Sequence, residues 1–171
     1  MRNIVTLVIA ALALGTAACG RKQVAPEPLP PVEQAPPGEV VAPGDVELTE
    51  LPAAQADLIA KAGSDTVYFG TDKYDLDDAT RATLAAQARW LIANPNVRAS
   101  IEGHADERGT REYNVALGER RANAARDFLV SQGVPTARLL VTSWGKERPV
   151  APGSNEEAWA QNRRAVTVLV R

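Results

Sequence analysis

Proline is concentrated in one part of this chain, and its distribution sets the domain organisation. Eight of the 12 prolines lie between Pro26 and Pro52. Proline fixes φ and has no backbone N–H, so a stretch rich in it is extended and semi-rigid and cannot form a core. We therefore interpret residues 19–64 as a tether, with a short helix over residues 52–62, and residues 65–171 as one folded domain. A domain of that length can bury a sizeable core.

The first 18 residues have the pattern of a secretory signal. The apolar run over residues 4–18 is too short to span a bilayer, which takes roughly 20 residues, and it suits the h-region of a signal peptide. The run ends at Cys19, the only cysteine, in a pattern similar to a bacterial lipobox, where Cys19 is lipidated and becomes the mature N-terminus. Thr16 stands where such signals usually have leucine. The alternative is a signal peptide cut near Ala18 beside an incidental cysteine. Gly20, in place of an aspartate, favours the outer membrane over the inner one.

Composition excludes several function classes. The formal net charge is −2, and residues 65–171 carry 14 acidic and 15 basic side chains, a balance that argues against nucleic acid as a partner. One cysteine excludes a disulfide scaffold and a multi-cysteine metal site. One histidine, His104, excludes a multi-histidine zinc or iron centre. We therefore expect neither a metal nor a cofactor.

Hydrophobic periodicity predicts that strands and helices alternate along the domain. Strands are expected at residues 66–69, 97–104, 138–144 and 165–170. A helix is expected to begin after Asp77 and to stop at Asn94, and a second to cover residues 112–131, with Gly133 at its C-terminal end. With a short helix before the last strand, the order is β-α-β-α-β-(α)-β. This order predicts an α/β (α+β) sandwich in which helices pack on a mixed four-stranded sheet.

The densest polar segment, residues 102–110, follows a predicted strand and leads into a helix. On that helix Asn114, Leu117 and Arg121 are spaced i, i+3, i+7 and share one face. Arg121 can bind a carboxylate through two parallel hydrogen bonds, and Asp106 in the loop can accept from an ammonium. Together they suit a small zwitterion. The alternative is a surface ion pair that contributes about 0–1 kcal/mol.

Several long motifs match one family. Residues 102–114 (EGHADERGTREYN) and 117–125 (LGERRANAA) closely resemble those of the peptidoglycan-associated lipoproteins, whose C-terminal domain is OmpA-like. Residues 68–69, 72–75, 143–149 and 162–166 resemble further signatures of the same family. The resemblance covers nearly all of residues 65–171, together with the layout of signal and anchor.

The resemblance implies an OmpA-like domain that binds non-covalently to meso-diaminopimelate in the stem peptide of peptidoglycan. In the family, the acid matching Asp106 takes the ammonium and the arginine matching Arg121 takes the carboxylate. Other positions that line the family's pocket correspond here to Arg108, Asn114 and Leu117, with Phe69 and Asp72 at its rim. The resemblance also implies an outer-membrane lipoprotein on the periplasmic side that works with TolB and other Tol components in envelope integrity and cell division.

Three function classes remain in competition. The first is a non-catalytic tether between the outer membrane and the cell wall, and the second is a hydrolase or amidase acting on the wall. The third is a partner-binding envelope lipoprotein without affinity for the wall. A hydrolase needs a nucleophile beside a base, or a metal. No such motif stands in the sequence, so we expect no catalytic residues and no enzymatic activity.

Other charged clusters have simpler interpretations. His104 beside two acids is more often a hydrogen-bonded structural residue than a metal ligand. The acidic residues at 75, 77 and 78 are expected to stabilise a helix start and not to bind Ca²⁺. Two adjacent arginines such as Arg163 and Arg164 could bind an anion, but we expect them to be solvent-exposed side chains at the start of a strand.

Overall fold

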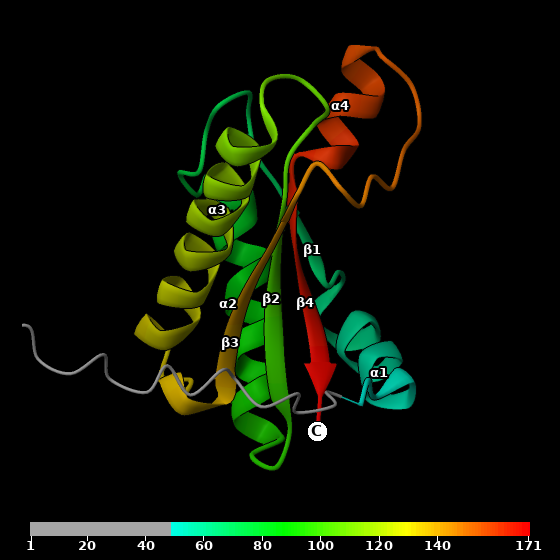
Figure 1. The fold of residues 1–171 in the computed structure, drawn as a ribbon. Helices are drawn as coiled ribbons and strands as arrows, with labels where there is room; N and C mark the ends of the chain where they lie inside the picture. The colour runs from blue at the N-terminus through cyan, green and yellow to red at the C-terminus, as the bar shows by residue number, and fades with distance from the viewer. Residues whose placement is uncertain (1–48) are drawn as a thin grey trace, which may run out of the picture. The chain divides into compact units, whose positions relative to one another are not determined.

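Helices and strands alternate along residues 49–171, the part of the chain that this computed structural model describes (Figure 1). The helices are α1 (Pro52–Ala62), α2 (Asp78–Ala93), α3 (Arg111–Ser131) and α4 (Glu156–Asn162), with a 3-10 turn, η1, at Thr136–Arg138. The strands are β1 (Thr66–Tyr68), β2 (Arg98–His104), β3 (Leu139–Gly145) and β4 (Arg164–Val170). The predicted alternation is confirmed. The predicted signal segment, Cys19 and most of the predicted tether lie outside the described residues.

The four strands form one mixed sheet in the order β1-β4-β2-β3. β2 and β3 are parallel, whereas β4 runs antiparallel to both β1 and β2. Because of this pairing, Gly103 near the end of β2 lies opposite Ala165 near the start of β4. The predicted fold class, helices packed on a mixed four-stranded sheet, is confirmed.

The core lies between the sheet and helices α2 and α3, which cover one of its faces (Figure 1). Alternate residues of the central strands point into it, and Ile101 of β2 and Leu169 of β4 are completely buried. Leu84 of α2 and Leu129 of α3 are equally buried. Full burial of one leucine or isoleucine side chain contributes about 1.5–3 kcal/mol. This packing fixes the position of α3 above the end of β2.

The folded part begins before residue 65, where the proline distribution placed its start. Leu58 of α1 is completely buried in the core, and the backbone N–H of Leu51 donates to the carbonyl of Leu169 over 3.1 Å. The expected short helix at 52–62 therefore exists, but it belongs to the domain and not to the tether. The physical reason is that Pro52 stands in the first turn of α1, where its missing N–H costs nothing.

Two glycines bring α3 into backbone contact with β2. A Cβ atom added to Gly103 would lie 1.8 Å from the carbonyl oxygen of Gly118, and one added to Gly118 would lie 2.4 Å from Oγ of Ser143. Both distances are far below van der Waals contact. The approach holds the N-terminal half of α3 over the end of β2, so the loop between them, residues 105–110, closes tightly.

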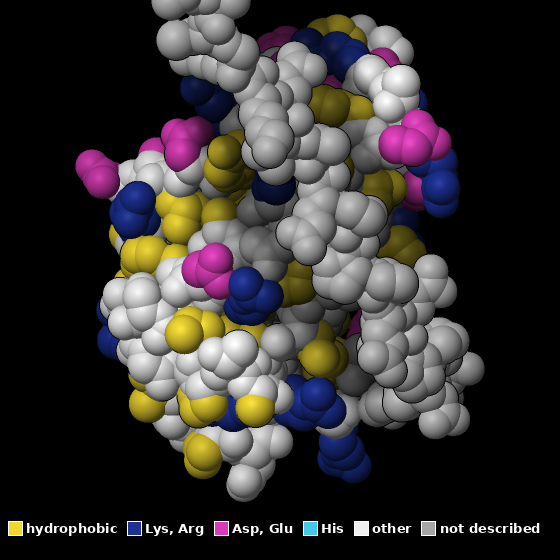
Figure 2. All heavy atoms as spheres, turned by 60° about the vertical axis from the view of Figure 1, so that its left-hand side comes forward, with side chains coloured by type: hydrophobic (Ala, Val, Ile, Leu, Met, Phe, Trp, Pro, Cys, Tyr) yellow, Lys and Arg dark blue, Asp and Glu magenta, His cyan; other side chains and the backbone are white. Residues whose placement is uncertain are grey.

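The surface of the domain is electrostatically mixed. Figure 2 shows acidic and basic side chains interspersed on the side where α3 lies, with hydrophobic side chains between them. Among residues 49–171, no helix is both long and apolar enough to cross a membrane.

Candidate functional site

A cavity of about 280 Å³ opens where β2 ends and α3 begins. Its walls come from the segment after β1, the loop after β2 and the first two turns of α3. The residues that line it are Thr71, Asp72, Asp106, Arg108, Gly109, Tyr113, Asn114 and Leu117. We call this cavity the cleft.

Five of the seven candidate site residues line the cleft, and two do not. Phe69 and Arg121 lie outside its lining, and both are buried, with 6% and 0% of their surface exposed. Thr71 belongs to the segment 69–72 that the resemblance placed at the rim, whereas sequence reasoning missed Gly109 and Tyr113. Tyr113 could have been found from the sequence, because it is adjacent to Asn114 in the first turns of α3.

Asp106 carries the negative charge in the wall of the cleft, and only 8% of its surface is exposed. Its Oδ1 accepts from the backbone N–H and from Nε of Arg108, over 3.1 and 3.0 Å. Its Oδ2 accepts from Nη2 of Arg108 over 2.7 Å and lies 3.5 Å from Nη1 of Arg163. Two guanidinium groups therefore compensate one nearly buried carboxylate.

These contacts keep Asp106 ionised. Burial alone raises the pKa of the Asp106 carboxyl, and it is the largest single effect. The hydrogen bonds from the side chain and backbone of Arg108, with the charge of Arg108 and the contact to Arg163, together outweigh it. The net result is a pKa below the ordinary value of an aspartate. At neutral pH the cleft therefore offers a full negative charge.

Arg121 does not line the cleft but holds together the chain segments that form its wall. Its Nε, Nη1 and Nη2 donate to the backbone carbonyls of Lys73, His104 and Gly70, over 2.8, 2.8 and 3.1 Å. The guanidinium carbon also lies 5.3 Å from the centre of the Phe69 ring. Burial lowers the pKa of Arg121 to about 10, and the charge of Asp106 partly opposes that shift. Arg121 remains a cation at neutral pH and joins the segment after β1 to the end of β2.

Two further side chains shape the wall. Asn114, 2% exposed, donates from Nδ2 to the carbonyl oxygen of Arg108 over 2.7 Å and so fixes the loop that carries Asp106. Tyr113 donates from its hydroxyl to Oδ1 of Asp72 over 3.2 Å, which closes the rim between α3 and the segment after β1. The predicted sharing of one helix face by Asn114, Leu117 and Arg121 is confirmed by their common burial.

The expectation of a solvated strand start at Arg163 and Arg164 is wrong, because both residues are buried, with 6% and 9% of their surface exposed. Nε of Arg163 donates to the carbonyl of Phe69 over 3.0 Å, and its Nη2 donates to Glu156 of α4 over 2.7 Å. The physical reason is that α4 and the end of β1 fold over the start of β4. The NRR motif alone does not reveal these partners, since Phe69 lies 94 residues before Arg163 and Glu156 lies at the opposite end of α4.

Helix α4 also contacts the cleft through an aromatic ring. The guanidinium carbon of Arg108 lies 4.1 Å from the centre of the Trp159 ring, a stacking geometry that favours a cation over an aromatic face. Trp159 in turn donates from Nε1 to Oε1 of Glu107 over 3.0 Å. The position of Arg108 is thus set from two sides, by a carboxylate and by an indole.

The residues described hold no group of three or more histidine, cysteine, aspartate or glutamate side chains that suits a metal ion. His104 is 3% exposed, and its Nδ1 has no hydrogen-bond partner among residues 49–171. Burial, with the nearby charges of Arg164 and Arg148, lowers the pKa of His104 to about 4. The histidine is therefore neutral at pH 7 and buried, as expected of a structural residue, but the hydrogen bond of Nδ1 is not made among residues 49–171. The acidic residue Asp77 caps α2 as expected, accepting from the N–H of Thr80 over 2.7 Å.

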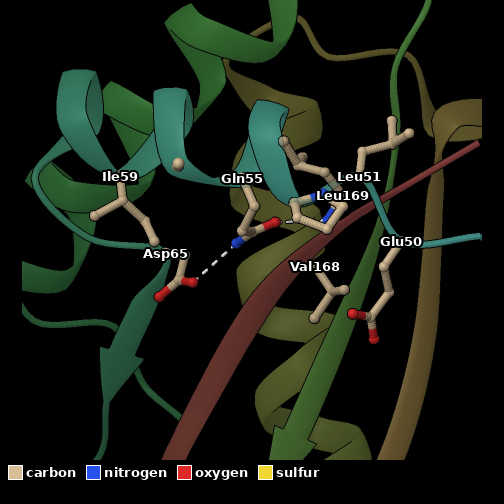
Figure 3. Close-up of a pocket in the computed structure, with 9 residues that line it drawn as sticks. Glu50, Leu51, Gln55, Ile59, Asp65, Val168 and Leu169 are labelled. Carbon is tan, nitrogen blue, oxygen red and sulfur yellow. Dashed lines mark hydrogen bonds between the residues drawn. The ribbon is translucent and has the colours of Figure 1, made fainter.

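A larger cavity, about 410 Å³, lies at the other end of β4 (Figure 3). Leu51 and Ile59 give it an apolar wall, and the side chain of Gln55 crosses it to Asp65. The Gln55 amide also donates to the carbonyl of Thr167 and accepts from the N–H of Leu169, over 2.8 and 2.9 Å. The amide of Gln55 thus pairs with backbone groups of β4 and with Asp65, and this cavity does not resemble the charged cleft.

Comparison with known proteins agrees with the fold described above. The OmpA family matches residues 68–163. A peptidoglycan-associated lipoprotein of Agrobacterium fabrum is 47% identical over 158 residues, which are 92% of this chain and 83% of that relative. The crystal structure of the peptidoglycan-associated lipoprotein from Burkholderia pseudomallei is 46% identical with a TM-score of 0.61, over 63% of this chain and 91% of that one. The C-terminal domain of Helicobacter pylori MotB shares the fold at 20% identity and a TM-score of 0.57, over 61% and 83% of the two chains. The chain therefore belongs to the OmpA family, with peptidoglycan-associated lipoproteins among its relatives.

Proposed function

We propose that this chain is an envelope lipoprotein that binds peptidoglycan non-covalently through the cleft. The ligand group is the zwitterionic end of meso-diaminopimelate, with its ammonium on Asp106 and its carboxylate on Arg121. The observation that carries the proposal is the ionised, nearly buried carboxylate of Asp106 in the cleft wall, close enough to Arg121 for its charge to act on that guanidinium. The relatives are named peptidoglycan-associated lipoproteins, which supports peptidoglycan as the ligand.

The charges of the cleft favour a zwitterion over a simple ion. A ligand that carries only an ammonium is repelled by the guanidinium of Arg108, which is already hydrogen-bonded to Asp106. A carboxylate alone meets Asp106 and Asp72. A ligand that carries both charges satisfies groups of both signs at once, and charge-assisted hydrogen bonds of this kind contribute about 1.5–3 kcal/mol each.

Arg121 has a double role in this proposal. A guanidinium has five N–H donors, and the three hydrogen bonds to backbone carbonyls use three of them. The remaining two are the donors that the proposal assigns to the carboxylate. Because Arg121 is completely buried and lies outside the lining of the cleft, the wall around it has to move before a ligand reaches them. Because Arg121 also supports the cleft, its replacement disturbs both the ligand contact and the wall, and a conservative variant is needed to separate the two.

The rest of the proposal concerns position in the cell. Lipidation of Cys19 would anchor the chain in the outer membrane, with the domain on the periplasmic side. Each buried CH₂ of an acyl chain contributes about 0.8 kcal/mol, so several chains give firm anchoring. We also propose that TolB and other Tol components are partners of the same domain, so that the chain serves envelope integrity and cell division through the Tol system.

Sedimentation of the purified chain with isolated cell walls tests the ligand. We expect the wild-type chain to sediment with the walls, and Asp106→Asn and Arg121→Ala to remain in the supernatant. Glu107→Gln is a matched control, because it removes one negative charge from the same loop without touching the cleft lining. Arg121→Lys should keep part of the binding. Sedimentation of folded Asp106→Asn and Arg121→Ala at the wild-type level would remove the site assignment and leave a partner-binding lipoprotein without wall affinity.

Metabolic labelling tests the anchor. Radiolabelled palmitate should label the chain in cells, and Cys19→Ala should abolish the label and release the chain from the membrane fraction. Absence of label in the wild-type chain, with unchanged fractionation of Cys19→Ala, would contradict lipidation.

A further inference from the structure

Arg163 is a buried cation that the proposed ligand contacts do not use. Only 7% of its side chain is exposed. Its Nε donates to the carbonyl of Phe69 at the end of β1, and its Nη2 donates to Glu156 of α4. These two bonds fix the guanidinium between the first residue of α4, the helix that Arg163 caps, and the segment at the end of β1.

The third nitrogen of this guanidinium faces Asp106. Nη1 of Arg163 lies 3.5 Å from Oδ2 of Asp106, is buried, and has no hydrogen-bond partner among residues 49–171. A buried donor without a partner costs free energy that one short shift toward an acceptor recovers. Oδ2 of Asp106 is the acceptor within reach, and in this structure it is taken over 2.7 Å by Nη2 of Arg108.

The two arginines on Asp106 differ in their freedom to move. The side chain of Arg108 is 39% exposed, whereas that of Arg163 is 7% exposed and held by two other hydrogen bonds. A ligand ammonium that reaches Asp106 can therefore replace the side chain of Arg108, whose guanidinium keeps its contact with the ring of Trp159. It cannot replace Arg163, whose release would break contacts in two other elements.

We propose that Arg163 is the positioning residue of the ammonium site, holding the Asp106 carboxylate in place and ionised while a ligand ammonium takes the place of Arg108. This inference rests on the proposed function, since it concerns the same site. Arg163 itself does not touch the ligand. It affects ligand affinity only through the position and charge of the Asp106 carboxylate.

The titration of Asp106 depends on a small set of neighbours. The charged groups around it are Arg108 and Glu107 of its own loop, Asp72 after β1, Arg121 of α3, Glu156 of α4 and Arg163 at the start of β4. His104 does not titrate between pH 5 and 7, because its pKa is lowered to about 4. When Arg108 or Arg163 is replaced, a change of ligand affinity between pH 5 and 7 therefore reflects protonation of Asp106.

The first test leaves Arg163 intact. In Arg108→Ala, the carboxyl carbon of Asp106 is followed by NMR as the pH is lowered. We expect its midpoint to stay at or below the ordinary aspartate value of 3.8, because Arg163 still faces the carboxylate. A midpoint above that value would mean that burial prevails and that Arg163 does not hold the charge, which would overturn the inference.

The second test measures the affinity for meso-diaminopimelic acid by calorimetry at pH 7 and pH 5. Arg163→Met should weaken binding about 10-fold at pH 7, with a further loss at pH 5 as Asp106 takes up a proton. Arg163→Lys keeps the cation and should restore a flat pH profile. Arg164→Met is the matched control: it removes the adjacent buried arginine, which bonds to the carbonyl of Arg148 and not to Asp106. Its affinity and pH profile should equal those of the wild-type chain.

The outcomes separate the two proposals. A wild-type chain that does not bind meso-diaminopimelic acid contradicts the proposed function itself. A wild-type chain that binds, together with a folded Arg163→Met of equal affinity and flat pH profile, contradicts only the role of Arg163. If Arg163→Met fails to fold, the NMR midpoint of Arg108→Ala decides.

Discussion

Nη2 of Arg108 donates to Oδ2 of Asp106 over 2.7 Å, while the same guanidinium lies 4.1 Å over the ring of Trp159. The acid of the cleft is therefore already paired before any ligand arrives. A ligand cation enters by exchange and not by filling an empty site. Such an exchange costs little only when the departing guanidinium keeps a favourable place, and the indole of Trp159 provides one.

Asp106→Asn should destabilise the fold by about 1–3 kcal/mol at pH 7, because it weakens two charge-assisted contacts in a nearly buried place. The pKa of Asp106 is lower in the fold than in the unfolded chain, so its contribution is complete above the ordinary aspartate value and is lost as the pH falls through the folded value. The difference between variant and wild type in urea unfolding should shrink below about pH 4. Asp127→Asn, an exposed control, should show no such trend. A difference that stays constant down to pH 2 would contradict this account.

His104 should make the fold sensitive to mild acid. Its pKa falls from 6.5 to about 4 on folding, so the unfolded chain binds the proton first and stability decreases as the pH is lowered between these values. The loss between pH 7 and pH 5 should be about 2 kcal/mol. His104→Gln, compared with wild type by urea unfolding at both pH values, should lack this part of the change. Equal pH slopes for the two chains would show that the histidine titrates normally.

Gly103→Ala should be strongly destabilising, by about 3 kcal/mol or more, because its methyl group meets the backbone oxygen of Gly118 and not a movable side chain. Gly118→Ala should also be destabilising, by about 1–3 kcal/mol, since its methyl group would lie 2.4 Å from the Ser143 hydroxyl and 2.9 Å from the backbone oxygen of Gly103, both longer than the 1.8 Å clash at Gly103. Gly70→Ala, where only the flexible side chain of Lys73 is near, is the control. Thermal unfolding ranks the three, and a Gly103→Ala chain as stable as the control would refute the close contact.

Helix α1 should be required for a stable domain. Leu58→Ala should cost about 2–5 kcal/mol, as expected for a completely buried leucine. A chain shortened to begin at Asp65 should lose still more, since it also lacks the Gln55 contacts to β4. Urea unfolding of the two chains beside the full-length protein measures both effects. If the shortened chain unfolded at the same urea concentration as the full-length one, α1 would be dispensable.

The parts of the fold that depend on local sequence could be predicted from it. Asp77 caps α2 as predicted, because its side chain accepts from the N–H group three residues ahead. Thr110 caps α3 in the same way, although that cap was not predicted. The strands and the two long helices follow from periodicity in the same way. The helix at α1 was predicted, but the proline distribution wrongly assigned it to the tether, because proline content does not show that Leu58 packs into the core.

The parts that depend on contacts between distant residues could not be predicted. Arg163 meets the carbonyl of Phe69, 94 residues earlier, and Trp159 meets Glu107, 52 residues earlier. No pattern along the chain shows that these groups converge. Arg121 was correctly placed on the helix face that also carries Asn114 and Leu117. Its three backbone partners could not be predicted, because they depend on how the segment after β1 crosses the end of β2.

The chain enters the sheet at the end opposite the cleft (Figure 1). The carbonyl of Thr49 accepts from the N–H of Arg171, and Leu51 bonds to Leu169, both at the end of β4. A mechanical load applied between Thr49 and a ligand in the cleft therefore runs along β4 and β2. Hydrogen bonds between antiparallel strands are perpendicular to that direction, so they are loaded in shear and must yield together. The domain thus resists being pulled apart along this line by the combined strength of its ladder, and not by one bond at a time.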